Sequence, residues 1–147
     1  MKNVYLAMIV ALYPLIGLAE VAVTDPWARA SILASRPAAT YLTFESDVDD
    51  RLVGITTPIA ETATIHAVEI VSDGGARMTA IEALDLPAGQ LVKLEPGYIH
   101  LMLMGLTNKL EENTSFALTP QFETGGEVTL DVPVLGIAAT GPEEASQ

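Results

Sequence analysis

The stretch that decides the fold runs from Thr62 to Glu82 and reads TATIHAVEIVSDGGARMTAIE. On both sides of Ser72-Asp73-Gly74-Gly75, polar and apolar residues alternate over most positions. This period of two is typical of a half-buried β-strand. Glycine and aspartate supply the backbone conformations that a tight hairpin turn requires. The stretch therefore predicts two antiparallel strands, over Thr62 to Ile70 and over Ala76 to Glu82.

The same pattern continues on both sides of this hairpin. Short alternating segments are separated by Gly, Pro, Asp and Ser, and no segment between residues 20 and 135 has the length and period of a helix. This pattern predicts an all-β fold, an antiparallel sandwich or barrel, as a single domain over residues 20–135. The expected strands are Glu20–Thr24, Thr40–Glu45, Leu52–Ile55, Thr62–Ile70, Ala76–Glu82, Gln90–Leu94, Tyr98–Leu106, Ser115–Glu123 and Glu127–Val134.

The two ends of the chain differ from this domain. Met1 to Ala19 combines Lys2, an apolar run from Val4 to Leu18 and small residues before Glu20, which is typical of a secretory signal peptide cleaved after Ala19. The apolar run is shorter than the roughly 20 residues of a membrane span, although an uncleaved anchor is the alternative. We expect an exported, periplasmic protein, with residues 136–147 forming a flexible acidic tail.

Charge and cysteine content exclude several classes of function. The chain has 7 basic and 19 acidic residues, a net charge of −12, which disfavours nucleic acid and anionic membrane surfaces as partners. It has no cysteine, so a blue-copper centre with its thiolate ligand, a thiol-disulfide activity and a lipid thioether are all excluded. Trp27, the one tryptophan, is most simply a core anchor.

Soft, uncharged donor atoms are concentrated in one part of the sequence. Imidazole nitrogen and thioether sulfur suit Cu(I), whereas zinc usually recruits Cys or carboxylate as well and Mg²⁺ and Ca²⁺ prefer oxygen. In a strand, His100 and Met102 lie on one face about 6.6 Å apart. Met104 continues that face and equally suits a place in the core. The candidate residues are both histidines and every methionine after the eighth residue: His66, Met78, His100, Met102 and Met104.

The spacing of these residues resembles that of the periplasmic copper chaperones of the PCu(A)C type. Their motif is a histidine often followed by a methionine, ten residues, a methionine, 21 residues and His-x-Met. Here His66 and Ala67 are followed by ten residues, Met78, 21 residues and His100-Leu101-Met102. Flanking segments also resemble the family: Trp27-Ala28-Arg29, Tyr41-Leu42-Thr43, Leu52-Val53-Gly54, Pro87-Ala88-Gly89, Leu94-Glu95-Pro96-Gly97 and Gly126-Glu127-Val128.

This resemblance implies a cupredoxin-like Greek-key β-sandwich that binds one Cu(I) per chain and passes it on. The ligands it implies are His66, Met78, His100 and Met102, and the acceptors are copper proteins such as the dinuclear centre in subunit II of cytochrome c oxidase, with other copper chaperones as further partners. Two features depart from the family. Ala67 stands where many members have methionine, and Tyr98-Ile99 stands where Gly-Tyr is usual.

Two alternatives belong to other classes of function. An enzyme is disfavoured because the chain lacks a Gly-x-Ser-x-Gly nucleophile elbow. The predicted mature terminus is Glu20 rather than the histidine that an amino-terminal copper oxygenase needs. A metal-free exported β-sandwich that serves as an interaction module is the second alternative, because a fold by itself does not imply a function.

Overall fold

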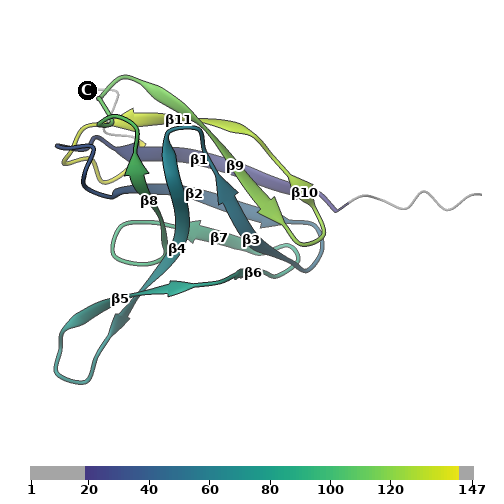
Figure 1. Cartoon of the computed structure of the whole chain (residues 1–147). Coiled ribbons are helices and arrows are strands. Elements are labelled where there is room, and N and C mark those ends of the chain that lie inside the picture. The colour runs from purple at the N-terminus through teal and green to yellow at the C-terminus, as the bar shows by residue number, and fades with distance from the viewer. Residues whose placement is uncertain (1–18, 143–147) are drawn as a thin grey trace, which may run out of the picture.

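The computed structural model of the chain describes residues 19–142, and it is built of strands and turns (Figure 1). The predicted signal peptide therefore lies outside the described residues except for Ala19. No helix within the described residues is long and apolar enough to cross a membrane. The strands are β1 Val21–Arg29, β2 Ala38–Ser46, β3 Asp50–Thr56, β4 Ala60–Ile70, β5 Ala76–Ile81, β6 Leu84–Leu86, β7 Leu91–Leu94, β8 His100–Leu106, β9 Ser115–Phe122, β10 Gly126–Glu127 and β11 Leu130–Leu135.

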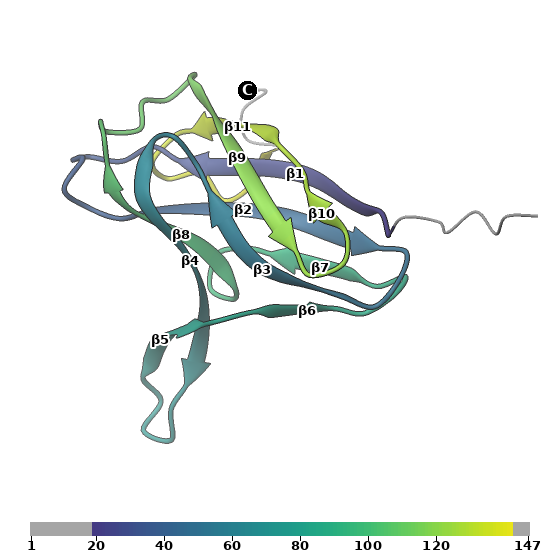
Figure 2. The same cartoon turned by 45° about the vertical axis from the view of Figure 1, so that its right-hand side comes forward.

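The strands form one continuous path of hydrogen-bonded neighbours in the order β5-β4-β8-β2-β1-β11-β9-β3-β6, with β7 added to β2 and β10 added to β9. All neighbours along this path are antiparallel except β1 and β11. The path folds over so that β3 and β9 lie in front of β1 and β2, as both views show (Figures 1 and 2). The predicted all-β sandwich is confirmed, and the β4–β5 hairpin projects from its body.

The core lies between the two layers because each strand turns alternate residues inward. On β9, Phe116, Leu118 and Phe122 are buried, and the ring of Phe122 meets that of Phe44 edge-on at 5.7 Å between centroids. On β8 the inward residues are Leu101 and Leu103, each fully buried. The alternate residues of β8, beginning with His100, therefore lie on the opposite face of the sheet.

The structure differs from the sequence prediction at three strands. β1 continues past Asp25-Pro26 to Arg29, because a register shift between Thr24 and Trp27 and a left-handed Asp25 (φ 50°) form a bulge that accommodates the proline. β6 was not predicted, since three residues are too few to show a period. The last predicted strand is divided into β10 and β11.

Part of the segment expected to be a flexible tail packs on the sandwich. Ala139 is buried against Trp27 and Tyr41, and its backbone amide donates a hydrogen bond to the carbonyl of Gly136 at 3.0 Å. The Nε of Arg29 donates to the carbonyl of Ala139 at 2.7 Å. Residues 143–147, the end of that predicted tail, lie outside the described residues.

A buried carboxylate organises the end of the sandwich near β10. Asp50 is 6% exposed and accepts hydrogen bonds from three backbone amides, those of Arg51 at 2.8 Å, Thr124 at 2.9 Å and Gly125 at 2.8 Å. Asp49, its exposed neighbour, accepts one bond, from the amide of Ala88 at 2.9 Å. Asp50 therefore ties the start of β3 to the turn between β9 and β10.

We expect Asp50→Ala to lower the free energy of unfolding by about 3 kcal/mol, because it leaves partly buried amides without an acceptor. Asp49→Ala, one position away, should cost less than about 1 kcal/mol because the amide it frees reaches water. Chemical denaturation of both variants measures the difference. Equal losses would contradict a special role for the Asp50 carboxylate.

Candidate metal centre

The register between β4 and β8 places the two histidines side by side. His66 is directly paired with His100, and the centroids of the two imidazole rings are 5.9 Å apart at an angle of 46°. Directly paired residues of neighbouring strands point to the same face. The sequence prediction that the histidines come together is therefore confirmed.

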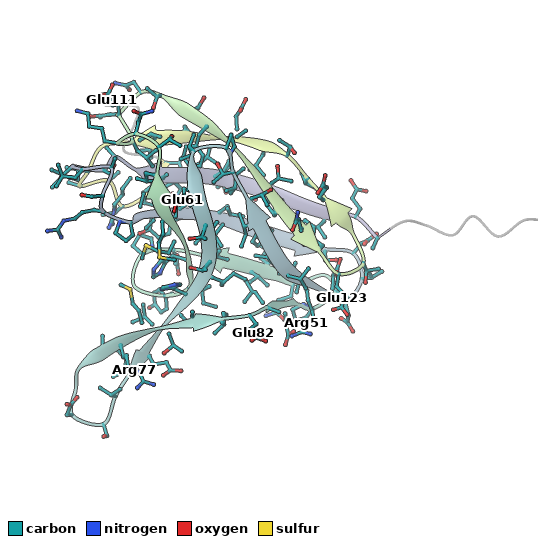
Figure 3. The ribbon with its side chains drawn as sticks, in the orientation of Figure 1. Arg51, Glu61, Arg77, Glu82, Glu111 and Glu123 are labelled. Atoms are coloured by element: carbon teal, nitrogen blue, oxygen red, sulfur yellow. The ribbon has the colours of Figure 1, made fainter. Side chains whose placement is uncertain are left out.

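The same registers place the methionines around this pair. Met102 is paired with Thr64, and Met78 is paired with Val68. Each methionine therefore lies two residues along its strand from the level of the His66–His100 pair, which we call the histidine row, and the two methionines lie on opposite sides of this row. Met104, paired with Thr62, lies one step further from the histidines than Met102. All five candidates thus share one face, and the sulfur atoms gather on one side of the molecule, beside β8 and β4 (Figure 3).

His100 is buried, and its ring makes one hydrogen bond to the backbone. It is 4% exposed, and its Nδ1 lies 3.3 Å from the carbonyl oxygen of Tyr98. Donation from Nδ1–H to that carbonyl leaves Nε2 with its lone pair free. Burial lowers the pKa of His100 below its usual value, the Tyr98 carbonyl opposes this, and the charge of His66 adds to the lowering.

His66 carries an unmet bonding requirement. Its Nδ1 is buried and has no hydrogen-bond partner in the structure, and such an atom costs free energy unless something satisfies it. A metal–nitrogen bond of about 2.0 Å and the radius of each ring put two imidazoles that share one ion about 5 to 6 Å apart, centre to centre. The observed 5.9 Å fits that arrangement.

The rest of the donor set is soft and partly open to solvent. Met78 is 59% exposed and lies on β5, where the path of strands begins, while Met102 is half-buried. Residues 19–142 contain no group of three or more His, Cys, Asp or Glu that could hold a metal ion. Burial also raises the pKa of Tyr41, against the effect of Arg29, so this neighbour stays neutral. An ion on this face would meet two imidazoles and thioethers.

The sequence did not identify the residues that adjoin this pair on β1 and β2. Tyr41 lies 6.4 Å from His100 and 4.4 Å from Trp27, between ring centroids. Trp27 is 4% exposed, but it packs with Tyr41 and Ala139 in a small cluster of its own, apart from the main core. Only the pairing of β1, β2 and β8, which are distant in sequence, brings these rings to the histidines.

A family model described as "Putative lipoprotein LpqE-like" matches residues 21–134. The chain belongs to the LpqE-like family. A relative of this LpqE-like protein, "Putative lipoprotein Lxx21020" from Leifsonia xyli subsp. xyli, is 35% identical over 85 residues, which are 56% of the chain and 50% of the relative. The chain thus matches about half the length of that relative. The 147 residues contain no cysteine to which a lipid thioether could be attached.

Solved structures resemble the LpqE-like chain in fold. The apo PCuAC domain of PmoF2 superimposes with a TM-score of 0.68 at 24% identity, covering 83% of this chain and 94% of that domain. The solution structure of CuI-DR1885 from Deinococcus radiodurans gives a TM-score of 0.61 at 25% identity, covering 76% of this chain and 75% of that one. The predicted cupredoxin-like sandwich of the PCu(A)C type is confirmed at the level of the fold.

The lowered pKa of His100 predicts a pH-dependent stability. Unfolding restores the ordinary pKa of about 6.5, so the unfolded chain binds more protons than the folded one. The stabilisation by neutral His100 is therefore complete above that value and is lost as the pH falls from there toward the folded pKa. We expect the metal-free protein to lose more of its free energy of unfolding between pH 8 and pH 5 than His100→Gln does. Parallel losses in the two proteins would refute this.

Proposed function

We propose that this protein is a copper chaperone that binds one Cu(I) ion through His66, Met78, His100 and Met102 and passes it to an acceptor copper protein. The observation that carries the proposal is the direct pairing of His66 with His100, with one methionine on each side of the pair on the same face. Two neutral imidazoles and two thioethers form a soft, uncharged set, which favours Cu(I) over Zn²⁺, Mg²⁺ or Ca²⁺.

Two further observations support this assignment. The buried, unpartnered Nδ1 of His66 offers a lone pair for the ion, and the bond from His100 Nδ1 to the Tyr98 carbonyl leaves the lone pair of Nε2 available to it. A solved structure of similar fold, CuI-DR1885, is named for its Cu(I). Copper is cargo in this proposal, and no reaction is catalysed.

The exposure of the ligands suggests how the ion is released. Neutral ligands leave the site with the single charge of Cu(I), and a thioether is a weaker donor than a thiolate, so an incoming ligand can displace one sulfur at a time. Met78 is 59% exposed on an edge strand, whereas His100 is 4% exposed. The acceptor therefore approaches from the Met78 side, and His100 is the last ligand to dissociate from the ion.

Export and partners complete the proposal. A chain exported by the signal peptide and cleaved after Ala19 would act in the periplasm, where subunit II of cytochrome c oxidase and other copper chaperones are suitable partners. The acidic charge of −12 favours a partner with a basic docking surface. Mixing the Cu(I)-loaded protein with an isolated oxidase copper domain should transfer copper to that domain. If the LpqE-like chain retains all of its copper, the oxidase domain is excluded as the acceptor.

We expect Cu(I) titration under anaerobic, reducing conditions to reach one equivalent per chain. Met102→Leu, which nearly conserves volume, should weaken Cu(I) binding by about tenfold or more, equivalent to about 1.4 kcal/mol, with an unchanged melting temperature. Competition against a Cu(I) chelator measures the affinity. Absence of any binding would favour the metal-free interaction module.

Met104→Leu is the matched control for this experiment. Met104 lies on the same strand and the same face as Met102 and is similarly half-buried, but it is a further step from the histidine row. Its replacement should change the Cu(I) affinity by less than about threefold, since a step along the strand is about 6.6 Å. The reverse order of effects would replace Met102 by Met104 in the ligand set.

A further inference from the structure

Four rings form one row across four neighbouring strands. Trp27 on β1 is paired with Tyr41 on β2, and His100 on β8 is paired with His66 on β4. The β2–β8 register pairs Thr40 with Leu101, so one step further it brings Tyr41 opposite His100. The ring centroids along the row are 4.4, 6.4 and 5.9 Å apart. Tyr41 and His66 therefore flank His100 on its two sides.

Tyr41 is fixed from several directions. It is 4% exposed, and the ring of Trp27 packs on it at 4.4 Å. The guanidinium carbon of Arg29 lies 5.8 Å from the Tyr41 centroid and 6.0 Å from that of Trp27, within reach of a cation–π interaction. Arg29 is held in turn by its 2.7 Å bond to the carbonyl of Ala139, which packs on the same two rings.

His100 needs such a neighbour because its hydrogen bond is weak. The 3.3 Å between Nδ1 and the Tyr98 carbonyl exceeds the usual N–H···O range of about 2.7 to 3.2 Å. A bond of that length restrains the imidazole less than a shorter one would. A packed aromatic pair contributes about 0.5 to 1.5 kcal/mol beyond its buried area, which is enough to select one ring orientation.

We propose that Tyr41 is a positioning residue of the copper site: clamped by Trp27 and Arg29, its ring holds the His100 imidazole in the single orientation and tautomer that directs Nε2 to the ion. This inference rests on the proposed Cu(I) function for its consequence, weaker binding when Tyr41 is removed. It also makes a claim about the metal-free protein, the fixed tautomer of His100, that is independent of copper.

The test compares Tyr41→Leu and Tyr41→Phe with Phe44→Leu in the full chain. Phe44 is the matched control because it lies on the same strand, is fully buried and packs in the main core against Phe122. Cu(I) affinity is measured well below each melting temperature. We expect Tyr41→Leu to weaken binding about tenfold, in the range typical of groups that orient a metal ligand. Tyr41→Phe and Phe44→Leu should stay within about twofold of the wild type, although Phe44→Leu lowers the melting temperature.

The second readout is long-range ¹H–¹⁵N NMR of the metal-free protein at pH 8, where His100 is neutral. The wild type, Tyr41→Phe and Phe44→Leu should show one His100 tautomer, with the proton on Nδ1, and Tyr41→Leu should show an average of two. An unchanged tautomer in Tyr41→Leu would overturn the proposal. If the wild type binds no Cu(I), the copper function fails while the tautomer still decides the role of Tyr41. If Tyr41→Leu does not fold, Trp27→Leu takes its place, because it removes the ring that packs on Tyr41, and the same tautomer averaging is expected.

Discussion

The register between β4 and β8 is the constraint on which the rest of the molecule depends. It pairs His66 with His100 and, through the same alternation, turns Ile65, Leu101 and Leu103 into the core. A slip of one residue would exchange the faces, placing imidazoles among the apolar side chains of the core and turning the leucines out of it. The burial of these leucines therefore stabilises the same register that places the two histidines side by side.

The sequence was sufficient for the parts of the fold that depend on local pattern. The Ser72-Asp73-Gly74-Gly75 turn and the alternation on each side of it predicted the β4–β5 hairpin, and a period of two predicted that His100 and Met102 share a face. The sequence did not predict β6 or the continuation of β1 through Pro26. The first is only three residues long, and the second depends on a bulge whose geometry residue types do not specify.

The contacts between segments that are distant in sequence could not be predicted, for a different reason. Trp27 was expected to be a core anchor, and it is indeed buried, but it lies in the small cluster with Tyr41 and Ala139 beside the histidines. Its position follows from the β1–β2 and β2–β8 registers together, and each register is fixed by the packing of the whole sandwich. The metal-binding role of His66, Met78, His100 and Met102 stays a prediction.

The strands on the two sides of the paired histidines differ in how firmly they are packed, and this difference bears on the proposed release of copper. Toward β2, His100 packs beside the buried rings of Tyr41 and Trp27. Arg29 lies against both rings and donates a hydrogen bond to the carbonyl of Ala139. Toward β5, the sheet ends in a hairpin that projects from the sandwich (Figure 2). Met78 on this hairpin is 59% exposed. Edge strands with few buried contacts open at low free-energy cost, whereas packed central strands do not. In the proposed Cu(I) site, the exposed sulfur of Met78 would move while His100 stays in place, so the order of the strands would set the direction of exchange.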